Sequence, residues 1–319
     1  MTAGLSVPPL FAALAPAQRV LIAGAGGGFD VYAGLPLALA LAGQGKEIVL
    51  ANLSFSDLSE LAQQEWMAPG LALVDAESRG RSDYFPERTL VRWLRSENLD
   101  WRLYAIERAG VVPVAACYRE LIQRHDLDAL VLVDGGTDIL LRGDESGLGT
   151  PEEDAVSLVA ASEQHVEVRI VVSLGFGIDA FHGVASTDVL AALAALNRRG
   201  AYLGALSIPR DTAEGTAYLD AVRHAALHNR GRPSIVNGQI AAAISGDFGD
   251  VAVAGDPATG GLFVNPLMAI YFSVRLDELA ARSLYGDQLR STRTVAEVSR
   301  ILEEHRSRLT PAAPLPFPH

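Results

Sequence analysis

The chain has 319 residues, of which 49% are apolar and 20% are charged, so its composition is neither that of a disordered nor that of a fibrous protein. A formal net charge of -12 disfavours binding to nucleic acids, because an acidic surface repels phosphate backbones. The single cysteine, Cys117, excludes an internal disulfide and a cysteine-based zinc site.

No segment of the sequence suggests a membrane partner or a secretory signal. The most apolar run, 34–43, is too short to cross a bilayer and contains Pro36. Residues 1–18 lack the charged start that a secretory signal needs. We therefore expect a cytoplasmic protein with one α/β domain over residues 1–310 and a loose, proline-rich tail over 311–319.

Strands and helices are predicted to alternate through the first half of the chain. Residues 19–24 form an apolar run that ends in glycine, which is typical of a buried parallel strand. A glycine-rich turn and an Ala/Leu-rich helix to about Ala42 follow. Further strands are predicted at 47–51, 102–106 and 129–133, and a helix at 114–125. Between them, we expect short helices and a long irregular connection over 57–99.

The alternation continues through the second half of the chain. Strands are predicted at 168–174 and 201–208, and short strand-like pieces at 235–236 and 240–245. Helices are predicted at 155–161, at 187–199 with Ser186 or Thr187 as cap, and at 213–229, 266–281 and 295–309. This order indicates a three-layer, doubly wound α/β fold of Rossmann-like type, with a mostly parallel sheet.

Such a sheet binds ligands at the carboxyl ends of its strands. Four acidic residues follow predicted strand ends: Asp30, Asp134, Asp138 and Asp179. Because the ends of parallel strands meet at one edge of the sheet, we expect these four side chains to line one pocket.

The first strand-end loop, 24–30, is rich in glycine. The backbone N–H groups of Gly26, Gly27 and Gly28 could approach an anion, with Asp30 facing the ligand. The loop lacks the last glycine of a dinucleotide fingerprint and the Lys-Ser/Thr pair of a P-loop. The alternative is a tight turn that lets the helix and strand pack closely.

The second strand-end loop carries Asp134 and Asp138, then Asp144 and Glu145. Crowded carboxylates repel one another unless a cation, a proton or an amine offsets them, so these four residues are candidate ligands of a divalent cation, Mg²⁺ or Mn²⁺. We expect Gly135 or Gly136 to have a positive φ and to turn the chain, with Thr137 near the substrate. A solvated loop in which Asp134 and Asp144 cap backbone amides is the alternative.

The third strand-end loop, 175–183, places Asp179 three residues before His182, which suits an acid–base pair. The alternative is an exposed or structural histidine. Cys117 is expected inside a helix in a structural role, and no G-x-S-x-G elbow is present, so acyl-enzyme chemistry is disfavoured.

These motifs resemble domain-of-unknown-function family 1152 over roughly residues 15–305. The segments that carry the resemblance are 26–30, 133–138 with 143–145, 175–179 and 265–268. The resemblance supports the fold and implies no reaction.

A more distant resemblance is to D-glutamate cyclases. Ile106-Glu107-Arg108-Ala109-Gly110, Tyr118 and Asp134-Gly135-Gly136 follow the order of that family's motifs. The chain departs from the pattern at Val133, at Thr137-Asp138, at 141–143, and at Cys117 and Arg119. The resemblance implies lactam formation, with Glu107 or Asp134 as base and Arg108 fixing a substrate carboxylate. The alternative for Glu107 and Arg108 is a strand-end ion pair or an exposed pair.

The sequence thus favours a lyase- or cyclase-like enzyme that dehydrates a small carboxylate- or amine-bearing metabolite, with Asp134 as the most important group. The alternatives are a non-catalytic nucleotide- or anion-binding sensor and a metal-dependent hydrolase. The expected partner is a small-molecule substrate, and a homo-oligomer is left open.

Overall fold

The computed structural model describes residues 6–229, 231–251 and 262–316. The first five residues of the N-terminal segment, one residue of the basic stretch 223–232 and the last three of the proline-rich tail lie outside the described residues. Within the described ranges, no helix has both the length and the apolar character needed to span a membrane.

A nine-stranded sheet forms the centre of the molecule, in the order β3-β4-β5-β2-β1-β6-β7-β11-β8. The five strands from β5 to β7 are parallel, whereas β4 and β11 run antiparallel to their neighbours. In chain order the strands are β1 (Arg19–Gly24), β2 (Glu47–Ser54), β3 (Trp66–Ala68), β4 (Leu71–Val74), β5 (Arg102–Glu107), β6 (Ala129–Asp134), β7 (Val168–Ser173), β8 (Tyr202–Ser207) and β11 (Ile270–Arg275). The fold class expected from the sequence is confirmed.

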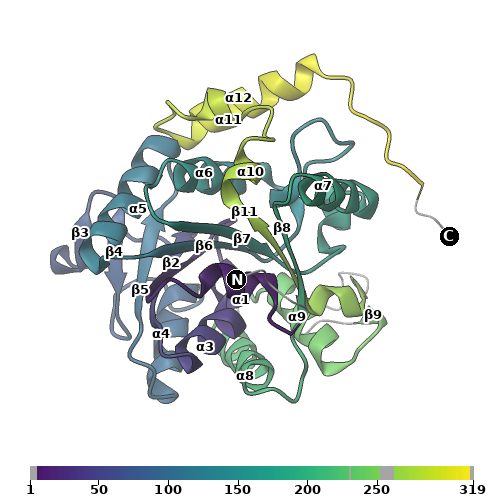
Figure 1. Ribbon diagram of the computed structural model, residues 1–319. Coiled ribbons are helices and arrows are strands. Elements are labelled where there is room, and N and C mark those ends of the chain that lie inside the picture. The colour runs from purple at the N-terminus through teal and green to yellow at the C-terminus, as the bar shows by residue number, and fades with distance from the viewer. Residues whose placement is uncertain (1–5, 230, 252–261, 317–319) are drawn as a thin grey trace.

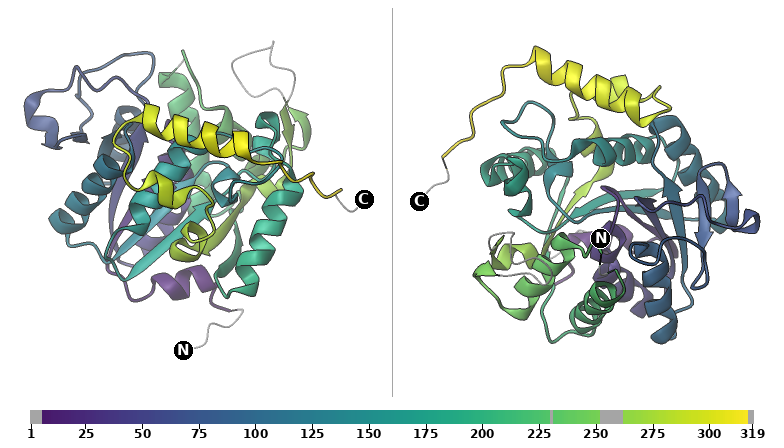
Figure 2. Two further views of the ribbon diagram at one scale, coloured as in Figure 1. Left: turned by 90° about the horizontal axis from the view of Figure 1, so that it is seen from above. Right: turned by 180° about the vertical axis from the view of Figure 1, so that it is seen from behind.

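Helices cover both faces of this sheet (Figure 1). One face packs against α3 (Leu35–Gly43), α4 (Pro86–Ser96) and α8 (Ala213–His228). The other packs against α5 (Val111–His125), α6 (Pro151–Ser162) and α7 (Ser186–Arg198). The remaining helices are α1 (Pro9–Leu14), α2 (Asp30–Ala33), α9 (Ile235–Ser245), α10 (Leu276–Ala280), α11 (Gly286–Leu289) and α12 (Val295–Arg308). Figure 2 shows that α12 lies outermost, beyond α6.

The strand residues explain the two cores. Along β1, Val20 and Ile22 point into one apolar cluster, and Leu21 and Ala23 point into the other. All four are fully buried, because a parallel strand with helices on both faces has no solvated side. Burying each large aliphatic side chain stabilises the fold by about 1.5–3 kcal/mol.

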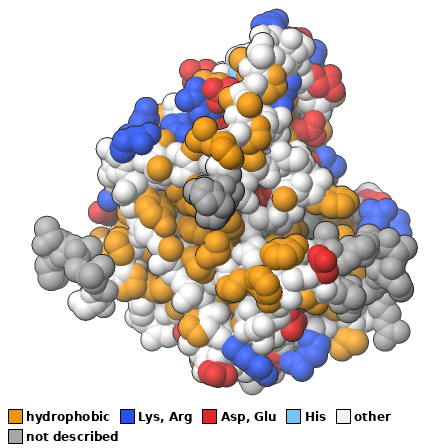
Figure 3. All heavy atoms as spheres, turned by 90° about the vertical axis from the view of Figure 1, so that its right-hand side faces the viewer, with side chains coloured by type: hydrophobic (Ala, Val, Ile, Leu, Met, Phe, Trp, Pro, Cys, Tyr) orange, Lys and Arg blue, Asp and Glu red, His pale blue; other side chains and the backbone are white. Residues whose placement is uncertain are grey.

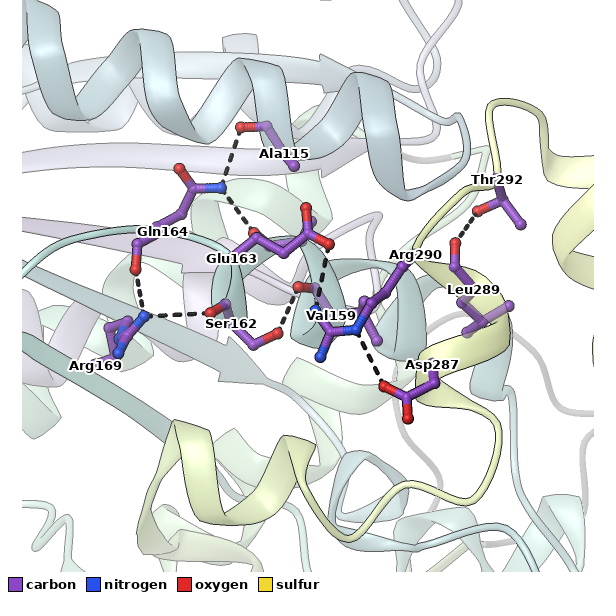
Figure 4. Close-up of polar contacts among 11 residues, drawn as sticks. Ala115, Val159, Ser162, Glu163, Gln164, Arg169, Asp287, Leu289, Arg290 and Thr292 are labelled. Atoms are coloured by element: carbon purple, nitrogen blue, oxygen red, sulfur yellow. Dashed lines mark hydrogen bonds and ion pairs between the residues drawn. The ribbon is translucent and has the colours of Figure 1, made fainter.

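Polar contacts hold the end of α6 in place (Figure 4). The Gln164 side chain donates hydrogen bonds to the carbonyls of Ala115 and Ala160, over 3.2 and 2.8 Å. Arg290 bridges Glu163 and Asp287, which ties the segment around α11 to α6. These contacts fix the helix whose first turn carries Asp154.

Three sequence predictions are wrong in part. Residues 235–245 form helix α9, not strands, because Ser234 caps the Asn237 N–H and Gly246 ends the helix in the left-handed region. The predicted helix over 266–281 is instead a short 3-10 turn (Pro266–Ala269), strand β11 and helix α10. The long connection over 57–99 contains the β3–β4 hairpin and the eleven-residue helix α4.

Two helix starts also differ from the prediction. The helix predicted at 155–161 begins at Pro151, and this brings Asp154 into its first turn. Helix α7 follows Ala185, so neither Ser186 nor Thr187 is its cap.

Strand β8 forms one edge of the sheet, beside α7. Viewed from this side, apolar side chains gather across the middle of the face (Figure 3). Leu190, on α7, is 40% exposed. The homo-oligomer remains an expectation from the sequence.

Candidate active site

Five aspartates meet at the carboxyl edge of the sheet. We call Asp30, Asp134, Asp138, Asp154 and Asp179 the aspartate cluster. The first follows β1, the second ends β6, the third follows β6 after a short turn, the fourth lies in the first turn of α6 and the fifth follows β7. Strands β1, β6 and β7 are neighbours in the sheet, which is why their ends bring these side chains together.

Carboxylate oxygens of Asp30, Asp134 and Asp154 lie within 4.8 Å of one another. A Cβ atom placed on Gly136 would lie 2.7 Å from Asp179 Oδ1 and 3.1 Å from Asp138 Oδ1, so those two oxygens face the same point. The structure therefore brings together all four aspartates that the sequence assigned to one pocket, and it adds Asp154.

Backbone and hydroxyl groups hold four of the five carboxylates. Gly26 N–H donates to Asp30 Oδ2 over 2.6 Å, and Gly136 N–H donates to Asp134 Oδ1 over 2.7 Å. Thr137 donates from both N–H and hydroxyl to Asp179 Oδ2, at 2.7 and 3.2 Å. Asp138 Oδ2 accepts from both groups of Thr150 in the same way, at 2.8 and 3.3 Å. Asp154 differs: its buried Oδ1 has no hydrogen-bond partner among the described residues.

Gly135 and Gly136 leave room for the neighbouring carboxylates and do not adopt a left-handed turn conformation. Neither Gly135 nor Gly136 has a positive φ, so the predicted turn geometry is wrong. A Cβ at Gly135 would lie 3.0 Å from Asp30 Oδ1, and one at Gly136 would crowd Asp179 and Asp138. Glycine is needed here because the carboxylates approach the backbone too closely for any side chain.

The electrostatics of the cluster are unfavourable for five ionised carboxylates. Burial, together with repulsion from neighbouring aspartates, raises the pKa of Asp30 to about 8 and that of Asp179 to about 7. The same causes raise the pKa of Asp134 and Asp154 well above the ordinary range, and burial raises that of Asp138. Within the described ranges, no Lys, Arg or His forms an ion pair with any of the five. The cluster must therefore hold protons or a cation.

Asn52 fixes the glycine loop, a role that the sequence did not reveal. At the end of β2 its side chain donates to Gly28 O (2.8 Å) and to Glu87 (2.7 Å), and accepts from Val31 N–H (3.3 Å). A Cβ on Gly24 would overlap its Oδ1 atom, so Gly24 makes room for Asn52. The signal in the sequence is Asn52 itself, an amide near the end of the second strand. A dinucleotide-binding site would have an acidic residue at this position.

Phe55 covers the glycine loop. Gly27 and Gly28 have φ of 92° and 61°, and the Phe55 ring packs against both. The Arg108 guanidinium lies 4.8 Å from the centre of this ring and pairs with Glu153, so it is held beside the loop and away from the aspartates.

Other residues singled out from the sequence lie outside the cluster. Glu107 and Arg108 are exposed and line a cavity of about 580 Å³ together with Phe55 and Cys117. Tyr118 is fully buried, and its hydroxyl has no hydrogen-bond partner among the described residues. Cys117 is buried, which raises the pKa of its thiol to about 12 and suits a structural role.

His182 is exposed, and in its charged form it would lower the pKa of nearby Asp138. Two of the four candidate metal ligands are engaged elsewhere. Asp144 pairs with Arg142 at 2.9 Å, and Glu145 accepts hydrogen bonds from the N–H groups of Arg142 and Gly143.

A larger cavity, of about 740 Å³, lies between α8 and α9. Phe29 and Tyr32, which flank Asp30 in the chain, form part of its wall. Asn237 of α9 links this wall to the loop, because its amide donates to Phe29 O over 3.2 Å and its Oδ1 accepts from Tyr218. The cavity thus shares a wall with the loop that carries Asp30.

The family described as a protein of unknown function (DUF1152) matches residues 21–308. No curated protein matches the chain. The match confirms the closer of the two family resemblances, and the resemblance to D-glutamate cyclases stays a prediction.

Proposed function

We propose that this chain, which belongs to the DUF1152 family, is an enzyme that acts on a small carboxylate- or amine-bearing metabolite by acid–base chemistry at the aspartate cluster. The observation that supports this is the convergence of five largely buried carboxylates with no basic side chain paired to them in the part of the chain that the structure describes. Such an arrangement destabilises a fold, whereas active sites often contain it.

Asp138 and Asp179 are the proposed acid and base. One oxygen of each is fixed by a threonine, and the other oxygens face a common point beside Gly136. Repulsion from Asp138 helps to raise the pKa of Asp179, so the pair favours holding one proton, and one member serves as acid while the other serves as base. A pKa of about 7 for Asp179 suits proton transfer near neutral pH.

The reaction class that fits this pair is an intramolecular dehydration such as lactam formation. An amine nitrogen attacks a carboxyl carbon, the base takes the amine proton, and the acid protonates the departing hydroxyl, which leaves as water. We assign these steps to Asp138 and Asp179 in preference to Glu107, because Glu107 lines a separate, exposed cavity.

The test is to incubate the protein with a panel of amino and carboxylic acids and to detect dehydrated products by mass spectrometry. Asp179→Asn should lower turnover by about 10²–10⁴-fold, the range for loss of a proton-transfer group. Asp144→Asn is the matched control, since Asp144 is ion-paired to Arg142 outside the cluster, and should retain full turnover. Full turnover by Asp179→Asn would show that the acid–base assignment is wrong. Stabilisation by nucleotides without any turnover would favour the sensor alternative.

A metal-dependent hydrolase is the second candidate. It is favoured by one observation, the unpartnered oxygen of Asp154.

A further inference from the structure

We propose that Asp30, Asp134 and Asp154 bind one oxygen-preferring divalent cation, Mg²⁺ or Mn²⁺, beside the Asp138–Asp179 pair. The role of the cation in catalysis rests on the proposed function, but its binding does not. When bound, such an ion activates water or polarises a substrate oxygen.

The spacing of the three carboxylates fits one ion. Their oxygens lie within 4.8 Å of one another. Ligands on opposite sides of a cation with bonds of about 2.1–2.5 Å are about 4–5 Å apart. The three ligands come from three separate elements, namely the start of α2, the end of β6 and the first turn of α6, so they surround a point without sharing one flexible loop.

Asp154 is the observation that points to a ligand. Its side chain is 3% exposed, and its Oδ1 atom has no partner among the described residues. A Cβ on Gly26 would lie 3.0 Å from this oxygen and 2.8 Å from Asp30 Oδ2, so the unpartnered oxygen is aimed at the space beside Asp30. A buried carboxylate oxygen without a donor is strongly disfavoured, and a bound cation removes that penalty.

Backbone N–H groups orient Asp30 and Asp134, as hydrogen-bond donors around metal sites orient ligating carboxylates. Asp30 and Asp134 each have one oxygen held by a backbone N–H, from Gly26 and Gly136. Hydrogen bonds of this kind hold a metal-ligating carboxylate in a fixed orientation. The second oxygen of Asp134 also accepts a longer hydrogen bond from Ile139 N–H, over 3.4 Å. Arg108 is paired with Glu153, the neighbour of Asp154 in the chain, and not with Asp154.

The experiment is titration of the full chain, freed of metal with EDTA, with Mn²⁺ followed by the electron paramagnetic resonance signal of the free ion. The wild-type protein should bind one Mn²⁺, and Mg²⁺ should displace it. Asp154→Asn should weaken binding by about 10–100-fold or more, as loss of a metal partner does. Asp144→Asn, which alters a carboxylate outside the cluster, should bind like the wild type.

Asp30→Asn is the second variant, because it removes the charge of the ligand at the start of α2 and keeps an oxygen that can accept from Gly26 N–H. Circular dichroism confirms that each variant is folded. The proposal is wrong if the wild type binds neither ion, or if both folded variants bind Mn²⁺ as it does. If Mn²⁺ fails to bind while Asp179→Asn still abolishes turnover, the cation site fails and the proposed function stands. If Mn²⁺ binds as predicted while Asp179→Asn keeps full turnover, the cation site stands and only the proposed function is rejected.

Discussion

Gly136 lies against two members of the aspartate cluster. A Cβ there would lie 2.7 and 2.8 Å from the two oxygens of Asp179 and 3.1 Å from Asp138. Both side chains are anchored by hydrogen bonds from threonines, through Asp179 Oδ2 and Asp138 Oδ2, and cannot withdraw without losing them. The carboxylates can therefore approach position 136 this closely only because glycine has no Cβ atom.

We predict that Gly136→Ala lowers the free energy of unfolding by about 1–3 kcal/mol, the usual cost of overpacking, and lowers turnover as the acid–base pair is forced apart. Gly43→Ala is the control, because no neighbouring side chain among the described residues lies within 4 Å of a Cβ at that helical position. Urea unfolding of both variants checks this. Equal stability of Gly136→Ala and wild type would mean that the pair is looser than the structure shows.

Asn52 acts between elements, joining β2, the glycine loop and the Glu87 of α4. We predict that Asn52→Ala lowers the free energy of unfolding by about 2–4 kcal/mol, because the buried Glu87 and Val31 N–H lose partners. The exposed Asn197→Ala, on α7, should change it by less than about 0.5 kcal/mol. Thermal and denaturant unfolding measure both, and a small effect at Asn52 would show that water replaces its side chain.

The elements that the sequence predicted well are the parallel strands, since their apolar runs are continuous and need no knowledge of the rest of the chain. Strand β11 was missed because its partners, β7 and β8, are about 70–100 residues away in sequence and it follows a Pro-containing turn. Helix α9 was missed because Asn237 and Gln239 interrupt its apolar pattern, although both are buried.

The aspartate cluster could be predicted only in part from the sequence. Four aspartates could be predicted because each follows a strand end, and parallel strand ends share an edge. Asp154 could not, because an acidic residue in the first turn of a helix is the ordinary response to the helix dipole. Its role depends on α6 being docked at the edge of β6, which only the three-dimensional structure shows.

At the scale of the whole molecule, the cluster makes stability depend on pH. The unfolded pKa of an aspartate is about 3.9, whereas folding raises that of Asp30 to about 8 and that of Asp179 to about 7. The folded state therefore binds more protons between these values, and stability is lost as the pH rises from about 4 to 8.

We predict that the melting temperature of the metal-free protein falls progressively from pH 5 to pH 8. The free energy of unfolding should fall by up to about 1.4 kcal/mol per pH unit for each raised carboxyl group. Asp30→Asn should flatten this dependence. Differential scanning calorimetry in EDTA measures it, and a melting temperature that rises over this range would show that the carboxylates are ionised and compensated by the protein itself.

We propose that the aspartate cluster serves function at the expense of stability. The most direct test is the melting temperature of Asp134→Asn relative to wild type, measured in EDTA at pH 8. The asparagine can still accept the hydrogen bond from Gly136 N–H, it gives up only the longer bond from Ile139 N–H (3.4 Å), and it cannot carry a negative charge beside the other carboxylates. We predict a higher melting temperature for the variant. A melting temperature several degrees lower would make Asp134 a structural carboxylate and would contradict the claim.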